Sequence, residues 1–192
     1  MTILAAERTL LSTINSGRGL LRTLACLLLG SLLIAASAQV SVPLKPVPMT
    51  MQSMTVLLVG MAYGWRLGAS TVLVYLAEGA MGLPVFAGFN AGIPYMMGPT
   101  GGYLGGFVLA AAAVGWLAEC GWSRSIPRAA VALLVGHAIL FIPGLGWLAN
   151  FIGWTRAITV GFLPFLLGTG IKVALGAVLM RAAWKVAPAE RI

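Results

Sequence analysis

The sequence predicts an all-α polytopic membrane protein with six transmembrane helices, and three observations support this fold class. Of the 192 residues, 60% are hydrophobic and only 8% are charged, whereas soluble domains carry roughly 25% charged residues. The twelve Lys and Arg and the four Glu are too few to solvate the surface of a globule of this length. The apolar residues fall into runs close to the roughly 20 residues that a helix needs to cross a bilayer. A soluble enzyme and a disordered chain are therefore excluded.

Six apolar runs define the expected transmembrane spans, which are 24–42, 49–65, 67–83, 100–119, 129–149 and 158–180. Arg66 separates the second run from the third and indicates a tight turn. Both of these runs are short, so their helices are expected to tilt little or to stop short of one interface. The six spans predict one membrane domain over residues 24–186, with cytoplasmic tails at 1–23 and 187–192.

The distribution of basic residues predicts the orientation of the spans. Six spans place both termini on one side, with nine basic residues: Arg8, Arg18, Arg22, Arg66, Arg124, Arg128, Arg181, Lys185 and Arg191. The opposite side carries only Lys45 and Arg156, and Lys172 lies inside the sixth span. Because cytoplasmic loops are enriched in Lys and Arg, both termini are predicted to be cytoplasmic. The net charge of +8 is interpreted in the same way, and not as a sign of nucleic-acid binding.

Two of the predicted outer segments have unusual composition. Residues 41–48 carry three prolines and cannot be helical throughout, because proline lacks the amide donor. Residues 82–100 are rich in Gly and Pro and also strongly apolar. We expect them to fold back over the bundle as a lid, since irregular backbone at membrane depth is tolerated where it lines a cavity. The alternative is a surface hairpin at the level of the lipid headgroups.

Lys172 is the most informative single residue. A cation deep in a span costs several kcal/mol and faces the bundle interior or a wet cavity, so it needs a negative partner. The chain has no Asp, and among the four Glu only Glu78 lies where it could reach the lysine. Lys172 is therefore expected to meet an anionic group of a ligand. A structural Lys172–Glu78 pair and a snorkelling lysine are the alternatives.

The glycine-rich stretch 98–107 is not a phosphate-binding loop, because it lacks the Gly-Lys-Ser/Thr ending. Its glycines recur at intervals of four, which predicts close approach of helix backbones. The alternative is that exposed amides at this helix start also contact a ligand.

Other polar residues give weaker signals. Gln52 and Asn90 lie at predicted outer boundaries, where contact with solvent is a sufficient explanation. His137 lies mid-span and is interpreted as a neutral core histidine, with a proton relay as the alternative. No Walker motif, nucleophile–base pair or metal-ligand cluster occurs, so we expect no enzyme activity, no cofactor and no metal.

Small residues mark one side of the first span, at Ser31, Ala35 and Ala38. Such a stripe can seat a second helix, either inside this chain or from a partner. The spacing alone does not choose between the two.

Three longer motifs carry a family resemblance. Residues 42–52, VPLKPVPMTMQ, resemble the pattern [IV]PLxPVPxTxQ, and residues 75–88, YLAEGAMGLPVFAG, resemble YLxxGxxGLPVFAG. Residues 98–107, GPTGGYLGGF, resemble GPTGGYLxGF. The chain thus resembles the BioY family, the biotin-specific S components of energy-coupling factor (ECF) transporters.

The resemblance implies a six-helix S-component fold in the bacterial inner membrane, with an outward-facing pocket capped by loops. It implies capture of biotin without chemical change. It also implies two kinds of partner, a membrane-embedded coupling T protein and cytoplasmic ABC-type ATPases. The alternatives are an S component for another small vitamin and, less expected, an intramembrane enzyme that uses His137 and Glu78.

The resemblance also suggests the site. Family members often carry PFLxGDxxK in the last helix, where this chain has PFLLGTGIK at 164–172. Lys172 aligns and could meet either the carboxylate or the ureido oxygen of biotin. Thr169 replaces the usual aspartate as partner of the ureido group. Residues expected to share that role are Asn90, Gln52 and Glu78, and residues expected to form an apolar wall are Tyr75, Phe86, Tyr103 and Trp147. The stripe Ser31, Ala35 and Ala38 is the expected docking surface for the T protein.

Overall fold

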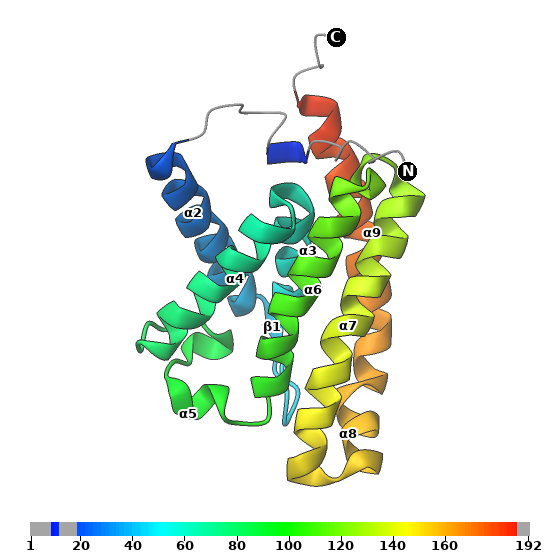
Figure 1. Ribbon diagram of the computed structural model, residues 1–192. Coiled ribbons are helices and arrows are strands. Elements are labelled where there is room, and N and C mark those ends of the chain that lie inside the picture. Colours follow the sequence, from blue (N-terminus) through cyan, green and yellow to red (C-terminus); the bar gives the residue numbers. More distant parts are fainter. Residues whose placement is uncertain (1–8, 12–18, 188–192) are drawn as a thin grey trace, which may run out of the picture.

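The computed structural model describes residues 9–11 and 19–187, and it is a bundle of helices (Figure 1). Six helices in these ranges have 12 or more residues: α2 (Leu20–Gln39), α3 (Gln52–Tyr63), α4 (Trp65–Ala80), α6 (Gly101–Glu119), α7 (Ile126–Ile152) and α9 (Leu163–Val186). The short α8 (Trp154–Gly161) precedes α9. The all-α class is confirmed.

Four segments in the described ranges are long and apolar enough to cross a membrane, namely α2, α6, α7 and Trp154–Val186. These segments support a membrane protein. Helices α3 and α4 have only 12 and 16 residues, less than the roughly 20 of a full span. The short second and third runs are thus confirmed as helices, and the count of six spans stays a prediction.

The helix boundaries differ from the sequence prediction most clearly at the start of the first helix and within the sixth run. Helix α2 begins at Leu20, inside the predicted tail 1–23, whereas residues 1–8, 12–18 and 188–192 of the tails lie outside the described residues. The sixth run was expected to be one helix from residue 158. It is instead divided between α8 and α9 at Phe162, with Pro164 in the first turn of α9. Proline has no amide to donate to the preceding turn, so it suits a helix start and interrupts a continuing helix.

The basic residues separate between the two ends of the bundle. In Figure 1, the start of α2, the α3–α4 turn, the α6–α7 connection and the end of α9 lie at the upper end. These parts contain six basic residues, Arg22, Arg66, Arg124, Arg128, Arg181 and Lys185. The lower end contains α8, with Arg156, and the connection between the two short strands, with Lys45. The described residues therefore divide as the charge pattern predicts, while Arg8, Arg18 and Arg191 lie outside them.

Helices α6 and α7 pack backbone against backbone at glycines. A Cβ added at Gly102 would lie 2.3 Å from the carbonyl oxygen of Pro143, and one at Gly106 would lie 2.8 Å from that of Leu140. These positions cannot take a side chain without moving α7. At Gly105, on another face of α6, an added Cβ would meet nothing within 4 Å. The close packing predicted from the glycine spacing is confirmed.

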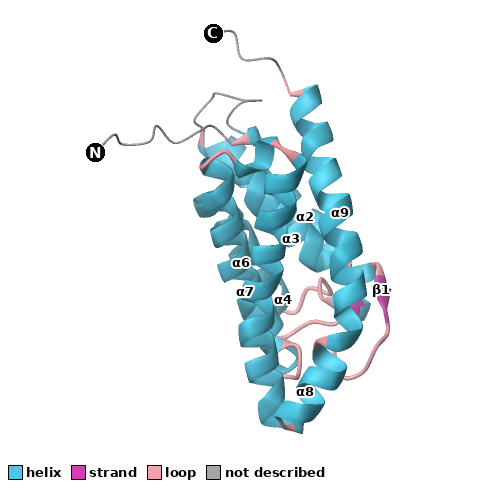
Figure 2. Cartoon of the chain, turned by 90° about the vertical axis from the view of Figure 1, so that its right-hand side faces the viewer, coloured by secondary structure: helices cyan, strands magenta, loops and turns pink. Residues whose placement is uncertain are grey.

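The proline-rich segment 41–48 forms a hairpin at the lower end of the bundle. Strand β1 (Ser41–Val42) pairs antiparallel with β2 (Met49–Thr50), with Ser41 opposite Thr50 and Val42 opposite Met49. In Figure 2 this hairpin lies beside the lower half of α9. The expectation that the segment is not helical throughout is confirmed.

Residues 82–100 fold back against the bundle, as the lid prediction requires. They contain the 3-10 turn η1 (Ala87–Phe89) and the short helix α5 (Ile93–Met96). The amide of Gly92 donates to the carbonyl of Gly79 at 2.7 Å. The side chain of Gln39 donates to the carbonyl of Phe86 at 3.0 Å and accepts from the amide of Phe89 at 3.1 Å. Hydrogen bonds to α4 and to the end of α2 thus anchor the lid.

The small-residue stripe of α2 packs inside this chain. Ser31, Ala35 and Ala38 are 2%, 9% and 0% exposed, and the Ser31 hydroxyl donates to Oε1 of Glu78 on α4 at 2.9 Å. These side chains are covered by the chain itself, so they do not form an open docking surface. The expectation that a partner protein contacts this stripe stays a prediction.

Candidate functional site

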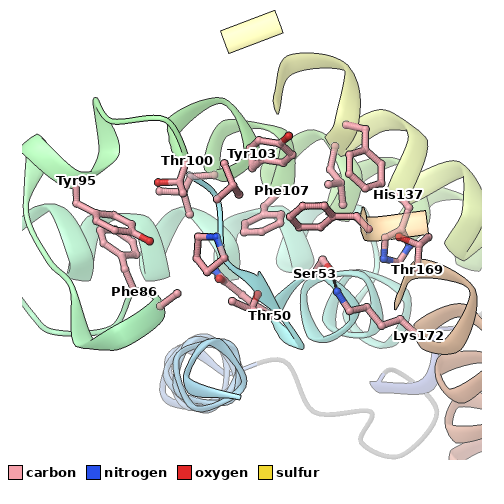
Figure 3. Close-up of a pocket in the computed structure, with 18 residues that line it drawn as sticks. Thr50, Ser53, Phe86, Tyr95, Thr100, Tyr103, Phe107, His137, Thr169 and Lys172 are labelled. Atoms are coloured by element: carbon pink, nitrogen blue, oxygen red, sulfur yellow. Dashed lines mark hydrogen bonds between the residues drawn. The ribbon is translucent and has the colours of Figure 1, made fainter. Parts of the chain in front are cut away.

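A cavity lies beneath the lid, between the hairpin and helices α3, α6, α7 and α9 (Figure 3). Helical spacing brings its side chains together: Phe165, Thr169 and Lys172 are four and three residues apart on α9, which places them on one face. Its lining residues are Val47, Pro48, Thr50, Gln52, Ser53, Phe86, Ala87, Tyr95, Thr100, Tyr103, Leu104, Phe107, His137, Leu140, Phe141, Phe165, Thr169 and Lys172.

One end of the cavity is polar and centres on Lys172. This side chain is 6% exposed, and its Nζ donates to the hydroxyl of Ser53 at 3.1 Å. The alternative of a Lys172–Glu78 pair is wrong, because Glu78 accepts from Ser31 instead. The buried ammonium thus contacts a neutral hydroxyl from α3 at the edge of a cavity, where a ligand can reach it.

His137 and Thr169 lie at the same end of the cavity as Lys172 (Figure 3). His137 is 3% exposed. Its Nδ1 lies 2.9 Å from the carbonyl oxygen of Leu133, and its Nε2 has no hydrogen-bond partner in the described part of the chain. The imidazole therefore presents an unused polar atom at the cavity.

Aromatic rings form much of the remaining wall. Phe86 and Tyr95 stack with ring centroids 5.2 Å apart, and Figure 3 shows them at the end opposite Lys172. Burial raises the pKa of Tyr95, so its hydroxyl stays protonated. Tyr103 stacks on Phe165 at 6.5 Å, and its hydroxyl donates to the carbonyl of Gly161 at 2.9 Å. The wall is thus mostly apolar.

Gln52 connects the cavity wall to the lid. Its Nε2 donates to the Tyr75 hydroxyl at 2.9 Å, and that hydroxyl donates to the carbonyl of Val85 at 3.1 Å. Tyr75 is fully buried and packs edge-on against Phe86 at 5.6 Å. These bonds hold the Gln52 amide in place at the cavity.

Of the nine predicted substrate-binding residues, the structure brings five to the cavity: Gln52, Phe86, Tyr103, Thr169 and Lys172. Their binding role stays a prediction.

The other four predicted residues lie elsewhere. Tyr75 lies behind Phe86, and Glu78 faces α2. Asn90 is exposed and donates to the carbonyl of Ala87 at 2.7 Å. Trp147 donates to the carbonyl of Gly98 at 2.9 Å and lines a separate recess between α6 and α7. Each has a structural contact that holds it away from the cavity.

Sequence reasoning did not assign Ser53, Tyr95, Thr100 or His137 to the site. His137 did carry a signal, since an ionisable residue inside a span is a functional candidate by default. Ser53 had none beyond following Gln52, because its role depends on where α9 places Lys172. Among the described residues, no group of three His, Cys, Asp or Glu side chains could hold a metal ion.

A model of the BioY family matches residues 7–189, nearly the whole sequence. The chain belongs to the BioY family. A probable biotin transporter BioY from Pyrococcus horikoshii is 38% identical over 147 residues, which cover 77% of this chain and 86% of the relative. The biotin transporter BioY of Thermotoga maritima is 40% identical over 148 residues, with the same two coverages.

A solved structure supports the same BioY assignment at the level of the fold. The crystal structure of the S-component for biotin from an ECF-type ABC transporter aligns with a TM-score of 0.77 and 26% sequence identity. The alignment covers 86% of this chain and 92% of that structure. The predicted family and the S-component fold are therefore confirmed.

Proposed function

We propose that this BioY-family chain is the biotin-binding S component of an ECF-type transporter and captures biotin without changing it chemically. The observation that carries the proposal is the lidded cavity with a buried lysine at one end and aromatic walls. The printed names of the relatives and of the similar structure support biotin as the substrate.

The chemistry of the cavity suits this ligand. Biotin has a ureido group, a fused apolar bicycle and an aliphatic tail that ends in a carboxylate. Ligand sites are typically apolar with a few placed polar groups, and here the hydroxyls of Ser53 and Thr169 and the ammonium of Lys172 supply donors at one end. Phe86, Tyr103 and the neighbouring rings provide the apolar surface. Five of the predicted residues are thereby proposed as substrate-binding: Gln52, Phe86, Tyr103, Thr169 and Lys172.

The proposal extends to orientation and partners. The chain would lie in the bacterial inner membrane as one membrane domain, with both termini and the basic end in the cytoplasm. The sequence has no Walker motif, so ATP-driven import requires other proteins. We expect these to be a membrane-embedded T protein and cytoplasmic ABC-type ATPases.

Calorimetric titration tests the substrate. The protein is purified in detergent from biotin-depleted cells and titrated with biotin, with thiamine and riboflavin as controls. We expect near-stoichiometric binding of biotin alone, and mass spectrometry of the released ligand should show unaltered biotin. Binding of a control vitamin instead, or no binding to folded protein, would overturn the proposed substrate.

An uptake assay tests the partners. Cells that produce this chain with its T protein and ATPases should accumulate labelled biotin, and an ATPase variant without its catalytic glutamate should abolish the accumulation. Equal uptake with the inactive ATPase would contradict the ATP-driven import assigned to the complex.

A further inference from the structure

The polar end of the cavity contains a polar atom that no group of the described chain satisfies. His137 is 3% exposed, lines the cavity, and leaves Nε2 without a hydrogen-bond partner among the described residues. A buried polar atom without a partner loses its hydrogen bonds to water and gains none in return, which is costly. Since native structures leave few such atoms, an orphan on a cavity wall points to a ligand group that completes it.

The other ring nitrogen determines what Nε2 can do. Nδ1 lies 2.9 Å from the backbone carbonyl of Leu133. A carbonyl oxygen only accepts, so Nδ1 carries the proton, and in the neutral imidazole Nε2 is then an acceptor. Lys172 lines the same end of the cavity (Figure 3), and a second cation at the same buried site would be repelled. Nε2 therefore offers a lone pair to the cavity.

Donor and acceptor together restrict the ligand group that fits. Lys172 offers N–H donors, whereas His137 offers an acceptor, and both line the same end of the cavity (Figure 3). A carboxylate only accepts, so it would leave Nε2 facing an oxygen atom with no proton between them. A cyclic urea has a carbonyl oxygen that accepts and N–H groups that donate. Of these two groups of biotin, the carboxylate and the cyclic urea, only the urea satisfies both side chains.

We propose that Nε2 of His137 accepts a hydrogen bond from one ureido N–H of biotin while Lys172 donates to the ureido oxygen. This assignment rests on the proposed function and makes His137 a substrate-binding residue of this chain. His137 thus adds a second acceptor beside the uncharged hydroxyl of Thr169. Thr169 occupies the position where the family resemblance leads one to expect aspartate.

Nuclear magnetic resonance of the imidazole nitrogens tests the contact directly. The chain has one histidine, so protein labelled with ¹⁵N-histidine gives the two ring signals of His137 alone. Without biotin, Nε2 should have the shift of an unprotonated nitrogen and Nδ1 that of a protonated one. Saturation with biotin should move the Nε2 signal toward lower shift and leave Nδ1 nearly in place. An Nε2 signal unmoved by saturating biotin would overturn the proposal.

Calorimetry with two ligands tests the energetic role. His137→Phe keeps a planar ring but removes the acceptor, and we expect the Kd for biotin to rise on the order of tenfold, the cost of about one hydrogen bond. His137→Gln retains an acceptor and should lose less. Biotin methylated at either ureido nitrogen provides the matched ligand. We expect the parent protein to bind the isomer methylated at the nitrogen that faces His137 much more weakly than biotin. For His137→Phe, the difference in Kd between these two ligands should be much smaller.

The outcomes separate this inference from the proposed function. If the parent protein binds no biotin, the proposed function fails, and the inference fails with it. If the parent binds biotin and His137→Phe binds it equally well, the inference alone is overturned. Should His137→Phe fail to fold, the Nε2 shift and the affinity of His137→Gln decide the question. An unmoved shift would then overturn the inference, whereas a moved shift would support it.

Discussion

Lys172 dominates the site at the scale of single residues. An ammonium has three N–H donors, and the hydroxyl of Ser53 accepts one of them. Ser53 is neutral, so nothing in this contact balances the charge of the lysine. A ligand oxygen placed beside Lys172 therefore gains a charge-assisted hydrogen bond, roughly twice as strong as a neutral one.

Lys172→Met should weaken biotin binding by on the order of 2 kcal/mol, or about thirtyfold in Kd, because the ligand would lose a buried donor. Methionine keeps the length of the side chain and removes its charge. Lys185→Met on the exposed end of the same helix is the matched control and should bind like the parent. Calorimetric titration measures both, and an unchanged Kd for Lys172→Met would remove the lysine from the site.

The sequence predicted some site residues well and others not, for a physical reason. Lys172 could be recognised because a charge inside a span is expensive wherever it lies. Asn90 and Trp147 were expected at the cavity but make hydrogen bonds to lid carbonyls and do not line it. The residue type alone does not show whether a polar side chain bonds to nearby backbone or to a ligand. The direction of these side chains is therefore known only from the folded lid.

Helix packing is the level at which the sequence was most informative about structure. The spacing of glycines in 98–107 indicated close approach, and α6 packs on α7 at Gly102 and Gly106. The small residues of α2 were ambiguous, because Ser31, Ala35 and Ala38 can seat any helix. In the structure these residues are buried within the same chain, and Ser31 contacts α4. The spacing of small residues on one helix does not indicate which helix will cover them.

Gly102→Ala should lower the thermal unfolding temperature, because the new Cβ would lie 2.3 Å from the carbonyl of Pro143 and would force α6 and α7 apart. Overpacking of this kind typically costs about 1–3 kcal/mol. Gly105→Ala, on the same helix where nothing lies within 4 Å, should be neutral or stabilising, since alanine favours a helix. Thermal unfolding in detergent compares the two, and equal melting temperatures would contradict the close packing.

The bundle as a whole is polarised by charge. Among the described residues, one end of the bundle carries six basic residues and the other carries two. The same asymmetry is visible in the sequence from the positions of Lys and Arg between the apolar runs. This feature was predictable because orientation depends on loop charges and not on packing. The lid and the divided sixth run were less predictable, since both depend on how the chain closes over its own helices.

Cysteine labelling tests the orientation in cells. Cys120 is exposed and follows α6 at the basic end. In a Cys26→Ser background, a membrane-impermeant maleimide should label Cys120 only after the cells are permeabilised. A second protein carries Cys26→Ser, Cys120→Ser and Arg156→Cys, so its only cysteine lies at the opposite end. This cysteine should be labelled in intact cells. The reverse pattern would place the termini outside.

Gln39 has a consequence for the kinetics of the site. It ends α2, does not line the cavity, and holds the lid at both Phe86 and Phe89 through its two amide atoms. Movement of Phe86 and Phe89 away from the end of α2 requires both of these bonds to break. Gln39→Ala should therefore raise the association and dissociation rates by similar factors and leave their ratio nearly constant, as stopped-flow fluorescence can measure. The residence time of the vitamin is then adjustable at a position that never contacts it.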